Sequence, residues 1–140
     1  MANALYPLWK KSSMTELDIN NSLDQTGVNA CSLALVMIGA GGYTYSASHQ
    51  YYNVVSGVQG TPAPMVNVTL TSNVVDADDA VFTNVTGTRI DGFVIYRGNA
   101  GASSTWRLVL YEDTGIVGFP MIPNGGNLLV AWSNQGIFAL

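Results

Sequence analysis

Turn-forming residues divide this chain into short segments, and their spacing constrains the fold more than any other feature of the sequence. The runs between the turns are short and rich in β-branched and aromatic residues. They lie at 30–38, 65–71, 79–85, 89–98, 105–113 and 127–133, and a last run, "GIFAL", ends at Leu140. No long stretch shows the 3.6-residue period of an amphipathic helix. The pattern therefore predicts an all-β sandwich or barrel.

Three of these runs carry further information. The run "ACSLALVMI" (30–38) is nearly all apolar, which is typical of a strand covered on both faces. Runs 89–98 and 105–113 flank a Gly/Ala/Ser-rich loop and predict a hairpin. The segment 60–65 contains Pro62 and Pro64, so it should be extended but unable to pair in the centre of a sheet. We expect "GIFAL" to be a final strand that completes a sheet.

Two segments predict short helices. The first is "YPLWKKSSMTEL" (6–17), in which Pro7 suits a first helical turn. The second is 46–57, which begins at a potential Ser46 cap and ends at Gly57. A length of 140 residues suits one domain. We therefore expect residues 1–140 to form a single β-sandwich domain with an N-terminal arm at about 1–25.

Charged residues are scarce, at 10% of the chain, against about 25% in an ordinary soluble domain. Positions 25–75 contain none, and neither do positions 114–140. Because free surfaces normally carry both signs of charge, this deficit predicts that much of the surface is buried against a partner. The net charge of −4 and the scattered Lys and Arg residues argue against nucleic-acid binding.

The sequence also argues against a membrane protein. The opening "MANALYPLWKK" places its lysines after its apolar residues, the reverse of a secretory leader. The longest apolar run, 33–38, is far too short to span a bilayer. We expect synthesis in a cytosol.

Candidate catalytic and metal-binding residues are few. The chain has one histidine, His49, and one cysteine, Cys31. We interpret them as a capping or packing residue and a small buried hydrophobe. A Ser-His-Asp arrangement stays open, but no nucleophile-positioning turn is present. Asp76, Asp78 and Asp79 are interpreted as a solvated turn, with calcium binding left open. No enzyme activity, cofactor or metal is predicted.

Four tyrosines gather in the charge-free half, at Tyr43, Tyr45, Tyr51 and Tyr52. Exposed tyrosines among Ser, Asn and Gly form either a sugar-binding surface or a protein interface. Packing beneath loops is the structural alternative.

Four segments carry a resemblance to a known family: "MANALYPLWKK", "YTYSASHQYYNVVSGVQG", "TGTRIDGFVIYRG" and "RLVLYEDTGIVGFPMIPNGGNLLVAWSNQGIFAL". In order and spacing they resemble short virion structural proteins of tailed bacteriophages, most of all the capsid cement, or decoration, proteins with a jelly-roll fold. One departure is Gln50, where related chains often carry an acidic residue.

The resemblance implies a non-enzymatic protein on the outer surface of an icosahedral phage head, made in the host bacterial cytoplasm. Its implied partners are the major capsid protein, whose lattice it would stabilise, and a second copy of itself in a homodimer. The alternative is a tail- or fibre-associated virion protein that binds host glycans. The predicted partner-binding residues are Leu5, Tyr6, Leu8, Trp9, Tyr51 and Tyr52. For the N-terminal residues the alternative is an arm folded back over an open end of the sandwich.

Overall fold

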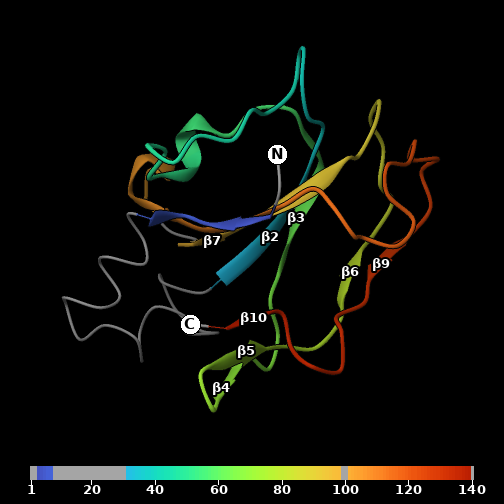
Figure 1. The fold of residues 1–140 in the computed structure, drawn as a ribbon. Helices are drawn as coiled ribbons and strands as arrows, with labels where there is room; N and C mark the ends of the chain where they lie inside the picture. The colour runs from blue at the N-terminus through green and yellow to red at the C-terminus, as the bar shows by residue number, and fades with distance from the viewer. Residues whose placement is uncertain (1–2, 8–30, 99–100, 140) are drawn as a thin grey trace.

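The computed structural model describes residues 3–7, 31–98 and 101–139 (Figure 1). In this part of the chain the fold is all-β, as the turn spacing predicts. The strands are β1 (Ala4–Leu5), β2 (Cys31–Val36), β3 (Val58–Pro64), β4 (Thr69–Thr71), β5 (Val74–Asp76), β6 (Ala80–Phe82), β7 (Gly92–Arg97), β8 (Arg107–Glu112), β9 (Leu128–Val130) and β10 (Phe138–Ala139). Two short 3-10 helices are η2 (Tyr52–Val54) and η3 (Ser103–Thr105). The jelly-roll topology within this class stays a prediction.

The strands form one large and two small antiparallel sheets. The main sheet has the order β1-β8-β7-β2-β3, and the small sheets have the orders β10-β5-β4 and β6-β9. Figure 1 shows the β10-β5-β4 sheet below the main sheet and the β6–β9 ribbon beside it. The predicted hairpin is β7–β8, and the strand expected from "GIFAL" is β10, which pairs with β5.

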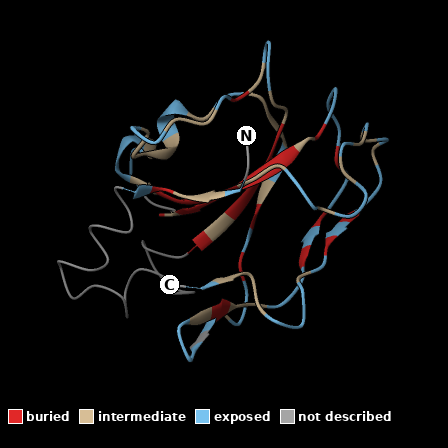
Figure 2. Ribbon diagram, in the orientation of Figure 1, coloured by how far each residue is buried: buried red, intermediate tan, exposed pale blue. Residues whose placement is uncertain are grey.

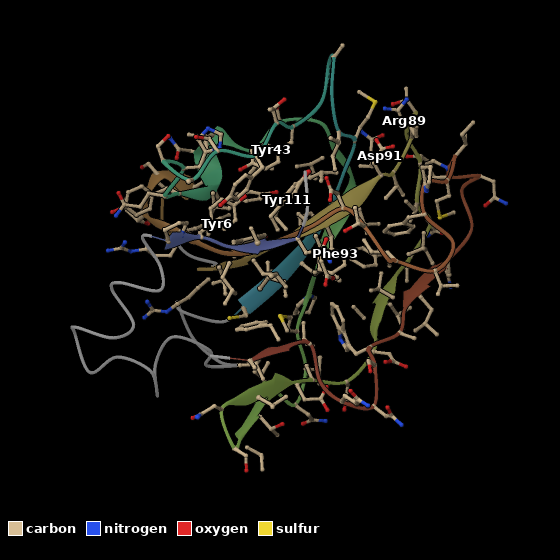
Figure 3. The ribbon with its side chains drawn as sticks, viewed as in Figure 1. Tyr6, Tyr43, Arg89, Asp91, Phe93 and Tyr111 are labelled. Atoms are coloured by element: carbon tan, nitrogen blue, oxygen red, sulfur yellow. The ribbon has the colours of Figure 1, made fainter. Side chains whose placement is uncertain are left out.

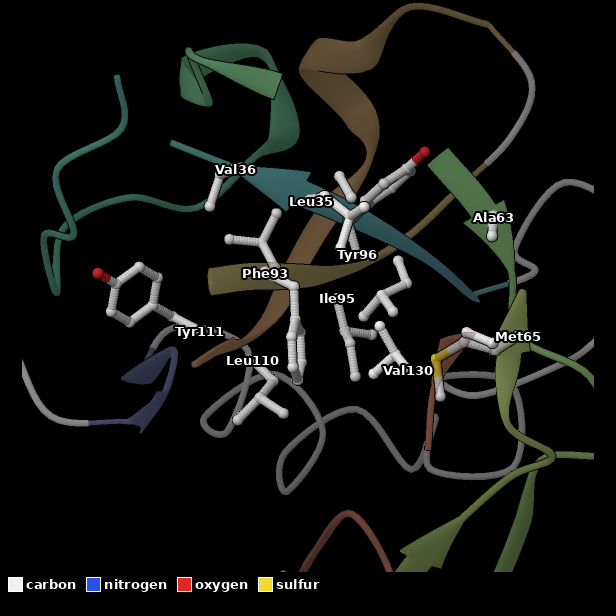
Figure 4. Close-up of a cluster of buried hydrophobic side chains, with 14 of the residues drawn as sticks. Leu35, Val36, Ala63, Met65, Phe93, Ile95, Tyr96, Leu110, Tyr111 and Val130 are labelled. Carbon is white, nitrogen blue, oxygen red and sulfur yellow. The ribbon is translucent and has the colours of Figure 1, made fainter. Parts of the chain in front are cut away.

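One hydrophobic core joins the three sheets. In β2, Leu33 to Val36 are fully buried, as its continuous apolar sequence predicts. The small sheets add Val75, Phe82 and Val130 to the same cluster. Figure 4 shows Val130 of β9 drawn with Ile95 of β7 in this cluster, and Figure 2 shows the buried residues concentrated in the central strands.

The proline-containing strand β3 lies at the edge of the main sheet, as its prolines predict. Its pairing with β2 is interrupted between Leu33 and Leu35, which face Ala63 and Gln59. Pro62 falls within this irregularity, where its missing N–H costs no ladder hydrogen bond.

Of the short helix predicted for 46–57, only the single 3-10 turn η2 forms, so the predicted bounds are wrong. The backbone of this segment pairs instead with β8: the Leu108 N–H donates to the Gln50 carbonyl at 3.0 Å, and the Tyr52 N–H donates to the Trp106 carbonyl at 2.8 Å. A helix would withdraw both groups from β8, so tertiary pairing outweighs the local helical pattern. Most of the other predicted helix, 6–17, lies outside the described residues.

The strand predicted for 65–71 is confirmed only at its end, in β4. Asn67 has a positive φ of 53°, which breaks the extended run. After Thr71 the chain reverses through Ser72 and Asn73, whose φ angles are 50° and 65°. Two central residues with positive φ match a type I′ hairpin turn, and β4 pairs with β5 accordingly.

Candidate functional site

The N-terminal residues Asn3 to Tyr6 are part of the fold. Ala4 and Leu5 pair with Tyr111 and Leu110 of β8. The next N–H, of Tyr6, donates to the Val109 carbonyl at 3.0 Å. Asn3 Oδ1 accepts hydrogen bonds from the backbone N–H groups of Asp113 and Thr114.

This placement corrects the prediction for Tyr6. Its side chain is fully buried, so in this fold it is a core residue and not a surface contact. The reason is that β1 completes the outer edge of β8 and directs Tyr6 into the interior. Leu5 is half-buried at the same edge and packs against the core. Leu8 and Trp9 lie outside the described residues.

Tyr6 belongs to a tyrosine cluster, defined as Tyr6, Tyr43, Tyr45 and Tyr111. The Tyr6 and Tyr43 hydroxyl oxygens lie 2.6 Å apart, and the Tyr43 hydroxyl lies 2.9 Å from His49 Nδ1. Figure 3 shows Tyr6, Tyr43 and Tyr111 gathered on one side of the main sheet. Burial raises the pKa of all four tyrosines, so their hydroxyls stay protonated and act as neutral hydrogen-bonding groups.

Tyr51 and Tyr52 lie further along the same edge of β8 and are half-buried. Tyr51 pairs with Arg107, whose guanidinium carbon lies 5.4 Å from the centre of the Tyr51 ring. The Tyr52 ring stacks on Tyr96 with centroids 4.0 Å apart and lies 5.9 Å from Trp106. Burial raises the pKa of Tyr52 to about 12. The structure thus brings Leu5, Tyr51 and Tyr52 to one edge of β8.

Sequence reasoning missed an apolar surface on the β6–β9 ribbon. Val81 and Leu129 face each other in register and are 55% and 59% exposed. Their neighbours alternate with them, since Ala80, Phe82, Leu128 and Val130 are all buried (Figure 2). Val117, which is fully exposed, lines the same groove as Leu129. We call Val81, Val117 and Leu129 the β6–β9 surface. The signal in the sequence was an apolar residue at both the inward and the outward positions of each strand.

A groove of about 430 Å³ opens beside this surface, between the loop 115–119 and residues 129–133. Its large apolar lining residues are Ile116, Val117, Phe119, Leu129, Val130 and Trp132. Trp132 is held in place, because its indole Nε1–H donates to the Asp78 carbonyl and its backbone N–H donates to Asp79 Oδ1. Its ring also meets the Phe93 ring edge-on, at 5.4 Å.

Beside the groove lies a second, smaller and more open compartment of about 190 Å³, and Glu112 is one of its lining residues. The linings of the two spaces share Gly115, Ile116 and residues 130–133, so the compartment adjoins the groove. Burial raises the pKa of the Glu112 carboxyl to about 7. Asn3 Nδ2 donates to Glu112 Oε1 at 3.3 Å.

Each of the three aspartates in the segment 75–80 accepts a hydrogen bond from a donor within the fold. Asp76 Oδ1 accepts from the Ala77 N–H, Asp78 Oδ2 from Asn67 Nδ2, and Asp79 Oδ1 from the Trp132 N–H. Within the described residues, no three His, Cys, Asp or Glu side chains gather as potential metal ligands.

Comparison with known proteins identifies no family for this chain. No protein-family model matches it, and a search of curated proteins gives no match. Over residues 3–7, 31–98 and 101–139, no helix combines the length and apolar character needed to cross a bilayer.

Proposed function

We propose that this chain is a non-enzymatic structural protein that binds the outer surface of a phage capsid and cements the major capsid protein lattice. The observation that supports this most is the β6–β9 surface. Outward positions of a two-stranded ribbon are normally polar in a free protein, yet Val81 and Leu129 occupy them here. Burying such side chains contributes about 1.5–3 kcal/mol each, so three of them favour association with a larger body.

The edges of the main sheet support binding through side chains and not through strand addition. At one edge, β3 carries Pro62 and Pro64. At the other, β1 and the segment 50–52 together cover β8. Edges blocked in this way resist edge-to-edge aggregation. A protein present at high local concentration on a lattice needs that protection, while its apolar face stays free to bind.

The remaining features come from the resemblance to phage cement proteins: location on the outer capsid surface, a jelly-roll topology and a homodimer. Leu8 and Trp9 stay proposed contacts of the N-terminal arm. Leu5, Tyr51 and Tyr52 are proposed contacts at the β8 edge. Each is half-buried, so part of its side chain is exposed and could contact a partner.

A tail- or fibre-associated protein that binds host glycans is the second candidate. The observation that favours it is the Tyr51–Arg107 pair, because an aromatic face beside a guanidinium suits stacking and hydrogen bonding to a sugar. The test is a glycan array with wild-type protein and Tyr51→Ala. Binding that the substitution abolishes would support this candidate.

The cement proposal is tested by adding purified protein to heads that lack it and locating the copies by electron microscopy. We expect many copies spread over the head. The double variant Val81→Ser/Leu129→Ser should bind far fewer. The matched control is Val54→Ser, which changes another exposed valine on η2, far from the β6–β9 ribbon in Figure 1. Copies confined to the tail, or no binding, would contradict the proposal.

A further inference from the structure

We propose that the groove beside the β6–β9 surface receives a lysine or arginine side chain of a partner protein, with its apolar stem along the groove and its cationic end at Glu112. This inference rests on the proposed function only in taking the occupant to be part of a protein. It names the chemistry of the partner contact, which the cement proposal leaves open.

The shape of the groove favours a long side chain. Its lining includes two exposed apolar side chains, Val117 from the loop 115–119 and Leu129 from β9. The adjoining compartment is lined by Glu112 together with Phe93, Ile116 and Ile137. Small-molecule sites typically measure about 300–1,000 Å³, so 430 Å³ is at the lower end and suits a side chain better than a large ligand.

Glu112 favours a cation as the end of that side chain. Its carboxyl is half-buried, and among the described residues no Lys, Arg or His forms an ion pair with it. The other residues that line its compartment carry no titratable group, and the amide of Asn3 is its one hydrogen-bond donor in the described chain. A carboxylate held among apolar side chains gains most from a charge-assisted hydrogen bond. The pKa of Glu112, raised to about 7, agrees with the absence of a cationic partner among the described residues.

As far as the described residues go, a second copy of the chain is a poorer occupant. The described arginines are already engaged: Arg89 pairs with Asp91 at 2.8 Å and donates to the Ile38 carbonyl, and Arg107 lies over Tyr51 (Figure 3 labels Arg89 and Asp91). Arg97 also has an interaction partner. A copy would have to break such a contact to supply the cation from these positions, whereas a different protein would not.

The test uses two blocked pentapeptides, one with a lysine between two leucines and one with norleucine in its place. Norleucine keeps the apolar stem and removes the ammonium group. Binding to the full-length protein is followed by amide NMR shifts. We expect the lysine peptide to bind about tenfold more tightly, as a hydrogen bond to a charged group suggests. The shifts should fall on residues 115–119 and 129–133.

Three variants give the test its controls. Glu112→Gln should remove the preference for lysine while the norleucine peptide binds as before. Leu129→Ser should weaken both peptides alike. Asp76→Asn removes a carboxylate on β5, outside the groove, and should change neither. Each variant is checked for an unchanged near-ultraviolet spectrum before binding is compared.

Several results would overturn the inference: no binding of either peptide, equal binding of both, or a lysine preference that survives Glu112→Gln. A dimer in sedimentation that Glu112→Gln dissociates would assign the groove to a second copy and also overturn it. Capsids play no part in this assay. A negative result in the peptide assay therefore does not contradict the cement proposal. Likewise, a failure of the protein to bind heads does not contradict a lysine preference found with the peptides.

Discussion

The hydroxyl groups of Tyr6 and Tyr43 meet inside the molecule, with their oxygens 2.6 Å apart. The contact joins residue 6, beside the first strand, to the loop that follows β2. His49 extends it, because its Nδ1 lies 2.9 Å from the Tyr43 hydroxyl. Both tyrosines are almost completely buried, so this short hydrogen-bonded chain fastens the N-terminal segment from within.

Tyr6→Phe should lower the free energy of unfolding by about 1–2 kcal/mol, because a buried hydroxyl loses its partner. For a chain of this size that corresponds to a fall of about 3–6 °C in Tm. Urea unfolding followed by circular dichroism measures the change. The matched control is Tyr45→Phe, which removes a hydroxyl from a less buried ring of the same cluster and should have a smaller effect. Equal effects of the two variants would contradict the role given to the Tyr6–Tyr43 contact.

Deleting residues 1–7 should destabilise the fold strongly. The deletion exposes the β8 backbone from Val109 to Tyr111 and empties the space filled by Tyr6. Loss of a buried aromatic side chain alone costs about 3–5 kcal/mol. Thermal unfolding of the free protein is the measurement. An unchanged Tm combined with lost head binding would instead mean that this segment serves docking and not folding.

The sequence predicted the main strands because their local residue patterns and their positions in the fold favour the same conformation. The continuous apolar run of β2 is typical of a strand covered on both faces, and the prolines of β3 favour an edge. The β7–β8 hairpin and β10 were likewise confirmed. In each case local propensity and tertiary environment favour the same conformation.

Other features depend on contacts between distant residues and could not be read locally. The segment 46–57 has a helical pattern, but the backbone groups of Gln50 and Tyr52 form hydrogen bonds with β8 and its flanking residue Trp106 instead. The compartment beside the groove combines Phe93, Glu112 and Trp132 from three separate parts of the chain. Tyr6 looked like an exposed anchor because its partner Tyr43 lies 37 positions away. Its burial follows from the topology alone.

Truncation of the two adjacent leucines in β9 should change stability to very different extents. Leu128→Ala should cost about 2–4 kcal/mol of stability, because Leu128 points into the core. Leu129→Ala should change stability by less than about 0.5 kcal/mol, because its side chain is exposed. Denaturant unfolding of the two variants is the measurement. A loss of more than about 2 kcal/mol in Leu129→Ala would show that the β6–β9 surface is not a free face.

Glu112 should make stability fall as the pH rises towards neutrality. Burial raises its pKa in the folded protein to about 7, from the ordinary value of 4.5. Between these two values the folded state binds more protons than the unfolded state, so the free energy of unfolding decreases with increasing pH. Above about pH 7 this contribution is lost. Allowing for solvent screening of a half-exposed group, we expect a change of about 1–2 kcal/mol. Urea unfolding at about pH 5 and about pH 8 measures it in the wild type and in Glu112→Gln. Subtracting the variant removes the contributions of the other carboxyls. If the two proteins lose the same stability over this range, Glu112 is not the group responsible.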